Sequence, residues 1–318
     1  MIRNRRGFAL LAAIWLVVAI ATVALQFALD ARERRLLGIN TAERGKGRAA
    51  ALGALNASQA ALEQSLRQGP GTGNARVALL RGADPWLDAD SIFSGVIFVD
   101  SIPVDVAALD LGTQLNINSM GEQQLRTFFS FALRDFATAD KIAQAVLDWR
   151  DADSIPRSNG AERDDYIRDG RLALPTNQTF REVSDILNVD GMTPEIYARV
   201  SPYLTTRGSG VINVNSADTV VLRAVPGMTD EMLANILTQR SMGRRISNLS
   251  NVMPRRAGVP NIPGLPGGLG GQVNGMTVDV SELQLTLTAY VGPQQLPVRL
   301  NAIIQRQGTN SRITWRQW

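Results

Sequence analysis

An apolar run from Phe8 to Leu29, preceded by three arginines, constrains this chain more than any other feature. As a helix that rises about 1.5 Å per residue, the run covers about 33 Å, enough to cross a hydrocarbon core of about 30 Å. A secretory signal has a shorter apolar core, about 7 to 15 residues, followed by a cleavage site, so we expect this segment to stay with the protein. Arg3, Arg5 and Arg6 favour a cytoplasmic N-terminus. We therefore expect a single-pass anchor in the inner membrane with a periplasmic ectodomain after Leu29.

The composition narrows the classes of function. The chain has 318 residues, 45% of them hydrophobic, which is enough for one or two domains with a real core. It contains no cysteine and no histidine, which excludes disulfides, thiol nucleophiles, imidazole bases and most zinc or haem sites. Lysine and arginine number 33 against 29 acidic residues, and much of that small excess lies in the first six residues. We therefore expect neither an enzyme nor a nucleic-acid partner.

A glycine and a phenylalanine stand at the cytoplasmic edge of the apolar run, in Arg5-Arg6-Gly7-Phe8. This stretch resembles the leader of type IV prepilins and pseudopilins, which a prepilin peptidase cuts after the glycine before the new N-terminal residue is methylated. The resemblance implies a leader over residues 1–7, cleavage between Gly7 and Phe8, and a membrane-spanning helix half over residues 8–29. The alternative is a plain signal anchor that carries the Gly-Phe pair by chance.

The fifth residue counted from Phe8 is Ala12, where most members of that family carry a glutamate. A lone carboxylate within lipid is costly unless it is paired, so a subunit with no neighbour above it does not need one. Its absence resembles the K-type minor pseudopilin of the bacterial type II (general) secretion system, although an alanine is also ordinary in a membrane helix. The resemblance implies a subunit that caps or initiates the pseudopilus tip and so supports export of folded proteins across the outer membrane. It implies as partners the I- and J-type minor pseudopilins, the major pseudopilin, the prepilin peptidase and secreted substrates.

Beyond the membrane, residues 30–68 are rich in helix formers without proline, so we expect the anchor to continue as one long helix. An intermittent apolar stripe that includes Leu36 and Leu37 predicts packing on a sheet. Strand character recurs at 95–118, 283–291, 297–305 and 311–318. The predicted fold is α+β: a pilin-like N-terminal helix packed on an antiparallel sheet, interrupted by a large helical insertion. The expected parts after the helix are 69–118 (first part of the pilin-like domain), 119–256 (insertion), 257–276 (Gly/Pro-rich loop) and 277–318 (C-terminal strands).

The insertion holds a near-repeat, Ile186–Val200 and Val221–Leu237, in which a Gly-Met-Thr turn joins two helices. Each copy resembles a helix-hairpin-helix unit. Acids such as Glu195 and Asp230 stand where DNA-binding versions approach phosphate and would repel it, so we interpret the repeats as packing units. A membrane-anchored, competence-like DNA-binding protein remains the alternative function. Two further stretches echo each other, "LNINSM" from Leu115 and "INVNSAD" from Ile212, where Ser216 is available as a helix N-cap.

Six carboxylates crowd one short stretch of the insertion: Asp148, Asp151, Asp153, Glu162, Asp164 and Asp165. Arg150, Arg157 and Arg163 offset part of this charge, and a hard divalent cation would offset it better. Without histidine or cysteine the expected ion is calcium rather than zinc. The spacing is not that of an EF-hand, because Ile155 and Pro156 occupy places that need an oxygen ligand and a glycine.

Two other interpretations of this acidic stretch stay open: a loop satisfied by arginines and water, or an anchored hydrolase that uses two carboxylates as acid and base. The K-type pseudopilins carry a similar run and bind calcium, so the resemblance implies a calcium site here. The matching positions are Asp148, Trp149, Asp151, Asp153, Gly160, Ala161, Glu162 and Tyr166.

Overall fold

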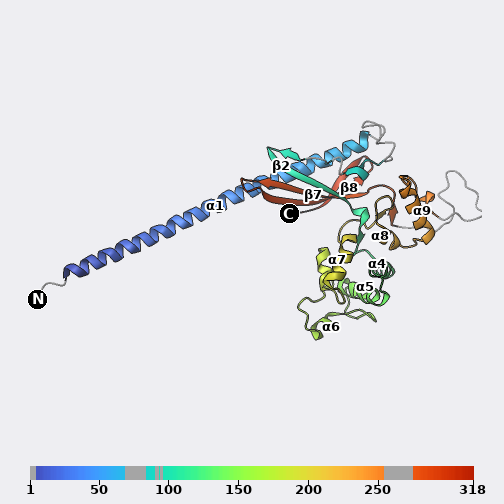
Figure 1. Cartoon of the computed structure of the whole chain (residues 1–318), viewed down its shortest axis with the longest axis horizontal. Helices are drawn as coiled ribbons and strands as arrows, with labels where there is room; N and C mark the ends of the chain where they lie inside the picture. The colour runs from blue at the N-terminus through green and yellow to red at the C-terminus, as the bar shows by residue number, and fades with distance from the viewer. Residues whose placement is uncertain (1–4, 69–83, 90–92, 94–95, 254–274) are drawn as a thin grey trace, which may run out of the picture.

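The computed structural model describes residues 5–68, 84–89, 93, 96–253 and 275–318, with side chains in the first helix from residue 11 onward. A long N-terminal helix lies along one face of a five-stranded sheet, and short helices form a lobe beside and beyond that sheet (Figure 1). The predicted α+β class, with its long helix and antiparallel sheet, is confirmed. Residues 1–4 of the predicted leader, residues 69–83 and the predicted loop up to residue 274 lie outside the described residues.

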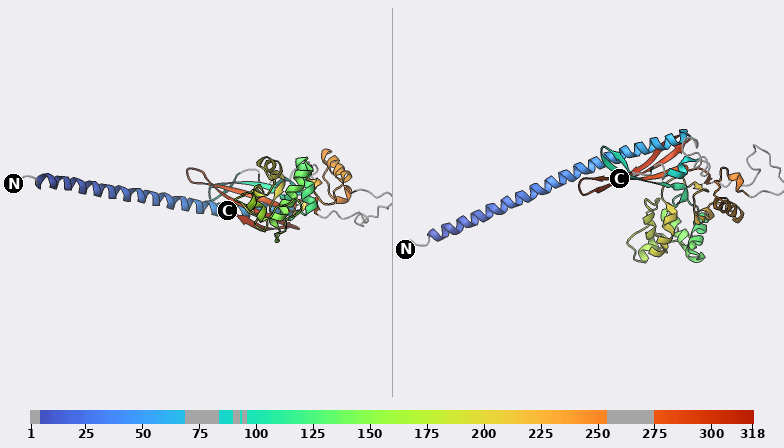
Figure 2. Two further views of the ribbon diagram at one scale, coloured as in Figure 1. Left: turned by 90° about the horizontal axis from the view of Figure 1, so that it is seen from below. Right: turned by 45° about the horizontal axis from the view of Figure 1, so that its top comes forward.

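Helix α1 (Arg5–Gln68) is continuous from the apolar run into the ectodomain. Its first part stands free of the rest of the molecule (Figure 2), and packing begins near Gly47, which lies against Val291 and Val298. The expectation that the whole apolar stripe packs on the sheet is wrong at its start, because Leu36 and Leu37 are 50% and 66% exposed. The sheet reaches only the C-terminal third of the helix, so the earlier residues have nothing to pack against.

The main sheet joins strands from both ends of the ectodomain sequence. The strand order is β1-β2-β7-β8-β9, and every neighbouring pair is antiparallel. The alternation of Leu283, Leu285 and Leu287 in β7 turns these residues toward α1, where all three are buried. The strands are β1 (Ile97–Val99), β2 (Ile102–Asp110), β7 (Glu282–Val291), β8 (Leu296–Gln307) and β9 (Asn310–Gln317).

Between β2 and β7 the chain forms the helical lobe, which has a hydrophobic core of its own. The α-helices are α4 (Glu122–Leu133), α5 (Phe136–Arg150), α6 (Arg163–Arg168), α7 (Pro194–Val200), α8 (Thr219–Arg223) and α9 (Asp230–Ser241). Two short parallel pairs accompany them, β3 (Leu115–Asn116) with β4 (Leu204–Thr205), and β5 (Ile212–Asn213) with β6 (Met276–Thr277).

The two Gly-Met-Thr turns have the same local geometry. Gly191 and Gly227 both adopt a positive φ, 80° and 81°, which a glycine accepts without strain. Thr193 and Thr229 then cap α7 and α9, each accepting a hydrogen bond at 3.2 Å from the backbone N–H three residues on. The acids that follow lie in the first turn of each helix, where their negative charge interacts favourably with the helix dipole.

The lobe is built from two units, and in each of them one asparagine side chain makes the same three hydrogen bonds to the backbone. We call this arrangement the asparagine hook. The amide nitrogen of Asn118 donates to the carbonyls of Phe180 and Thr206, and its oxygen accepts from the Phe180 N–H. Asn215 makes the same three bonds to corresponding backbone groups of its own unit. In both units an asparagine two residues earlier accepts from the hook residue's N–H. The echo between the two Asn-x-Asn-Ser stretches is therefore structural.

An arginine closes each unit from the end of its second helix. Arg150, the last residue of α5, donates to the carbonyls of Ile117 and Met120. Arg240, in the last turn of α9, donates to the carbonyl of Ala217 at 2.6 Å. Each guanidinium thus satisfies backbone carbonyls beside the asparagine hook, which ties the second helix of the unit to its short strand.

A buried carboxylate joins the lobe to the sheet. Asp84 accepts from the Val280 N–H at 2.7 Å and from Nη1 of Arg306 in β8 at 2.9 Å. Nη2 of Arg245, which comes from the lobe, lies 3.7 Å from Asp84 Oδ2, the oxygen that accepts from Val280. The Asp84 side chain is 1% exposed, so these partners compensate a charge that has lost its water.

Candidate metal centre

The acidic stretch begins in the last turn of α5 and ends at the start of α6. Asp148 lies in the buried last turn of α5, Asp151 is its C-cap, and Glu162 is the N-cap of α6. Because the intervening residues form a loop that returns to the end of α5, carboxylates distant in sequence meet in space.

Arg157 is the counter-ion inside this loop. Its Nη1 lies 2.5 Å from both Asp148 Oδ1 and Asp151 Oδ2, and its backbone N–H donates to Asp148 Oδ2 at 3.1 Å. Both oxygens of Asp148 are thereby occupied. Burial raises the pKa of the Asp148 carboxyl, whereas the bonds from Arg157 oppose that shift.

Gly160 permits the loop to close on α5. A Cβ at this position would overlap the carboxylate of Asp148. The Gly160 N–H donates to the Arg157 carbonyl at 3.0 Å, which forms a tight turn directly over the buried acid. The glycine of the Gly-Ala-Glu run is therefore explained by the close approach of backbone to a carboxylate.

Three of the six predicted carboxylates converge: Asp151, Asp153 and Glu162 each offer an oxygen, and these oxygens lie within 4.8 Å of one another. Calcium binds oxygens at about 2.3–2.6 Å, so two ligands of one ion stand up to about 5 Å apart. Asp153 is exposed, Asp151 is partly buried, and Glu162 is 3% exposed. The cluster thus spans from the surface to the interior of the lobe.

The buried oxygens of this cluster lack side-chain hydrogen-bond donors. Asp151 Oδ1 has no hydrogen-bond partner among the described residues, and the two Glu162 oxygens face no side-chain donor there, only the backbone N–H groups at the start of α6. Burial, with the charges of Asp148 and Asp151, raises the pKa of the Glu162 carboxyl to about 7. Buried carboxylate oxygens that lack a hydrogen-bond donor lower the stability of the folded state. A hard cation that binds oxygen ligands would satisfy them. The donor set therefore fits calcium.

The remaining acids of the stretch have other partners or face solvent. Asp165 accepts from the Glu162 N–H at 2.9 Å and pairs with Arg168 at 3.0 Å, so it serves the start of α6. Asp164 is exposed on α6. Of the arginines expected to offset the acids, Arg157 pairs with them, whereas Arg150 points to carbonyls of the first asparagine-hook unit.

An aromatic group holds the two ends of the loop. Trp149 stacks on Phe180 with ring centroids 6.3 Å apart and meets Tyr166 edge to face at 5.5 Å. The Tyr166 hydroxyl accepts from the Asp190 N–H at 2.7 Å. Trp149 and Tyr166 of the sequence run are therefore core residues, and they fix the acids at the end of α5 relative to those at the start of α6.

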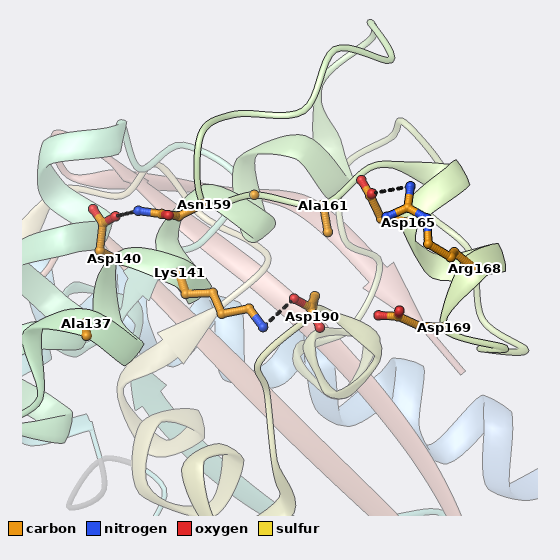
Figure 3. Close-up of a pocket in the computed structure, with 10 residues that line it drawn as sticks. Ala137, Asp140, Lys141, Asn159, Ala161, Asp165, Arg168, Asp169 and Asp190 are labelled. Atoms are coloured by element: carbon orange, nitrogen blue, oxygen red, sulfur yellow. Dashed lines mark hydrogen bonds and ion pairs between the residues drawn. The ribbon is translucent and has the colours of Figure 1, made fainter.

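A polar hollow of about 510 Å³ lies beside this loop, and it includes groups that sequence reasoning missed (Figure 3). Across it Lys141 pairs with Asp190 at 2.8 Å, and Asn159 donates to Asp140 at 2.7 Å. Asn177, also missed, donates at 2.7 Å to the Asp153 carbonyl and so fixes the exposed end of the cluster. No local motif marks these residues, because the groups that meet here come from α5, from the acidic loop and from segments after α6.

The predicted leader site lies at the far end of the molecule. Gly7 and Phe8 belong to the first turns of α1, where the backbone alone is described. Ala12 follows on the exposed part of the same helix. Among the described residues α1 is the one helix apolar enough to cross a membrane by length and composition, with a mean hydropathy of 2.3 over its best 18-residue window.

One segment of the chain matches a known family. Residues 105–208, which run from β2 through the acidic loop to the end of the first unit, match the family model "Type II secretion system (T2SS), protein K". The resemblance to K-type subunits inferred from the sequence is confirmed for this segment.

The chain also matches individual proteins that carry the same family description. The chain is 38% identical over 82 residues to type II secretion system protein K of Pectobacterium carotovorum subsp. carotovorum, and 39% identical over 66 residues to that of Dickeya chrysanthemi. These matches cover 24% and 21% of this chain and only 24% and 18% of the relatives' own length. A chain of the crystal structure of the GspK–GspI–GspJ complex from the enterotoxigenic Escherichia coli type 2 secretion system has the same fold. Its TM-score is 0.61 at 18% identity, over 87% of this chain and 97% of that one.

Proposed function

We propose that this chain, whose residues 105–208 match the protein K family, is a minor pseudopilin of a type II secretion system that caps or initiates the pseudopilus tip. In that role it supports export of folded proteins across the outer membrane. The observation that carries the proposal is the match itself, because it falls on the segment where the lobe leaves the sheet and holds the acidic loop. The shared fold adds the long helix and the sheet.

The membrane part of the proposal rests on α1. The apolar run lies in the inner membrane, Arg3, Arg5 and Arg6 stay in the cytoplasm, and the sheet and lobe lie in the periplasm. A prepilin peptidase cuts between Gly7 and Phe8, and the new N-terminal phenylalanine is methylated. The free part of α1 after residue 29 then has neighbouring pseudopilin helices to pack against, which accounts for its exposed Leu36 and Leu37.

The proposal of a calcium site rests on the buried carboxylate oxygens of Asp151 and Glu162 that lack a side-chain donor. Asp151, Asp153 and Glu162 hold the ion, with Asp148 keeping Arg157 in place beside them. When bound, calcium supplies positive charge and oxygen coordination that the lobe's own donors do not provide. The three carboxylates anchor the loop to α5 and α6, so the role is structural. An affinity of about 10⁻⁴ to 10⁻³ M suffices for an extracellular module.

The partner part of the proposal rests on the relative that assembles as a GspK–GspI–GspJ complex. We expect this chain to bind the I- and J-type minor pseudopilins of its own system, to contact the major pseudopilin below them, and to meet secreted substrates at the tip. The chain is a structural subunit rather than an enzyme. The comparisons give no support to DNA binding, and the acids at both Gly-Met-Thr turns disfavour it.

Co-purification tests this function. A tagged full-length chain, expressed with the I- and J-type subunits of its own secretion system, is extracted from membranes in mild detergent. We expect both subunits to be retained, and deletion of this chain's gene in its host to abolish secretion by that system. Secretion that continues normally in the deletion strain would contradict the proposal.

A further inference from the structure

Arg157 lies between two carboxylates that differ in burial. Its Nη1 contacts Oδ1 of Asp148 and Oδ2 of Asp151, at 2.5 Å each. The Asp148 side chain has no exposed surface, whereas that of Asp151 is 25% exposed and belongs to the three-carboxylate cluster with Asp153 and Glu162. One nitrogen of the chain itself therefore bridges a buried acid and a member of the candidate metal centre.

The carboxylate of Asp151 is divided between two uses. Its Oδ2 is held by Arg157, and its Oδ1 is buried without a hydrogen-bond partner among the described residues. A calcium ion held by Asp151 would therefore bind the same carboxylate as the guanidinium. Two cations on one carboxylate repel each other, and each withdraws negative charge that the other would use.

The other basic side chains of the acidic stretch lie elsewhere. Arg150 donates to the backbone carbonyls of Ile117 and Met120. Arg163 is exposed at the start of α6. Within the described part of the chain, the acids around the site form ion pairs with Arg157 alone. The counter-charge of the site is therefore that of a single side chain.

We propose that Arg157 is a built-in counter-ion that competes with calcium for the Asp151 carboxylate and so weakens calcium binding. This role rests on the proposed calcium site and names the residue that sets its affinity. Arg157 compensates the buried charge of Asp148 whether or not an ion is present, so the loop keeps its path without calcium. An ion that enters the site therefore has less negative charge left to neutralise.

An arginine in this place has another use, since a hydrogen-bond partner also orients a metal-binding carboxylate. The two uses predict opposite effects when the guanidinium is removed. Loss of a competitor strengthens calcium binding, whereas loss of an orienting partner weakens it. The backbone N–H of Arg157 donates to Asp148 Oδ2 at 3.1 Å, so a side-chain substitution leaves that bond of the loop in place.

The test is a calcium titration of the purified full-length chain in mild detergent, from about 1 µM to about 10 mM, which brackets the affinities of extracellular calcium modules. The unfolding temperature is measured at each concentration. A ligand that binds only the folded state stabilises it by RT ln(1 + [L]/Kd), so the concentration at which the temperature begins to rise reports the Kd. We expect R157Q to unfold at a lower temperature than the wild type in chelator, and to bind calcium with a Kd at least about tenfold lower.

Two further variants isolate the charge at this position. R157K keeps a positive charge on a single nitrogen, and its Kd should stay within about threefold of the wild-type value. The matched control is R163Q, which removes the same charge from the exposed arginine next to Glu162 in sequence. Solvent and salt screen that charge, so R163Q should also change the Kd by less than about threefold.

A Kd for R157Q equal to or above that of the wild type would overturn the role of Arg157 and leave the calcium site intact. Tighter binding of the same size in R157K or R163Q would overturn it too, because the gain would then not come from the charge at position 157. An R157Q chain that stays unfolded at about 10 mM calcium would also contradict it, since the ion should then compensate Asp148. If neither the wild type nor R157Q responds to calcium, the proposed calcium site itself fails.

Discussion

The backbone of Gly160 lies directly against the carboxylate of Asp148, so close that any side chain at position 160 would overlap it. This contact sets the path of the acidic loop, because the turn that carries Gly160 also places Arg157 over Asp148. The position of Glu162, two residues further on, depends on the same turn.

The first prediction follows from this contact. We expect G160A to lower the free energy of unfolding by about 1–3 kcal/mol, because the added methyl group must displace a buried carboxylate or the loop. Thermal and urea unfolding of the purified chain measure it. The control is G121A, at the N-cap of α4, where the added Cβ has no atom within 4 Å and where we expect a smaller cost of about 0.5 kcal/mol from the poorer cap. Equal effects of the two substitutions would contradict the account.

Calcium removal gives the second prediction. We expect millimolar calcium to raise the unfolding temperature of the wild-type chain and a chelator to reverse this, because an ion that binds only the folded state stabilises it. E162Q and D151N should lose most of the response. D164N serves as the matched control, since Asp164 is exposed on α6 outside the cluster. A response that survives in E162Q and D151N would show that the ion binds elsewhere.

The third prediction concerns pH in the absence of calcium. The pKa of Glu162 in the folded protein is about 7, above the value of about 4.3 expected in the unfolded chain. Between these values the folded state holds a proton that the unfolded state has released, so the free energy of unfolding falls as pH rises from about 4.5 to 7. Each unit of pKa difference corresponds to about 1.4 kcal/mol. Urea unfolding with chelator at pH 5 and pH 7.5 measures the fall, and E162Q should reduce it; an identical fall in E162Q would assign the proton to another group.

The fourth prediction concerns the junction between sheet and lobe. We expect D84A to destabilise the chain by about 1–3 kcal/mol, because it removes the buried acceptor of the Val280 N–H and of Arg306, whereas Arg245 keeps its pair with Asp279. Trp86 lies next to it and is 1% exposed, so its fluorescence reports opening of the junction. D105A, at an exposed position of β2, is the control and should change stability by less than about 0.5 kcal/mol. Similar urea midpoints for the two variants would show that Asp84 is not the link.

Sequence patterns predicted the elements better than their contacts. The strict alternation from Leu283 to Val291 identifies a strand with one buried face, and the apolar run and its helix-forming continuation identify α1. The same apolar stripe does not indicate where along α1 the sheet begins. Leu36 and Leu37 are exposed because the sheet does not reach them. Ser216 was available as an N-cap, yet it donates to Asp110 at 2.7 Å, and Asp218 caps α8 instead. The choice depends on a strand about a hundred residues away, which no local pattern contains.

The candidate metal centre shows the same limit. Six crowded carboxylates predicted a site, but spacing alone did not separate Asp151, Asp153 and Glu162 from the acids beside them. The separation is made by the turn at Gly160 and by the reach of Arg157 back to α5, and both are properties of the folded loop. Asn177 was missed because its contribution is a single hydrogen bond to a backbone carbonyl.

The central claim, that this chain enters a pseudopilus, is tested most directly at its N-terminus. The intact mass and N-terminal sequence of the protein are measured after extraction from membranes of cells with and without the prepilin peptidase. The account predicts a mature chain that starts at a methylated Phe8 when the peptidase is present, and an uncut chain that keeps Gly7 when it is absent. A chain that begins at Met1 in both strains would contradict it, because a subunit that keeps its leader remains a plain membrane anchor.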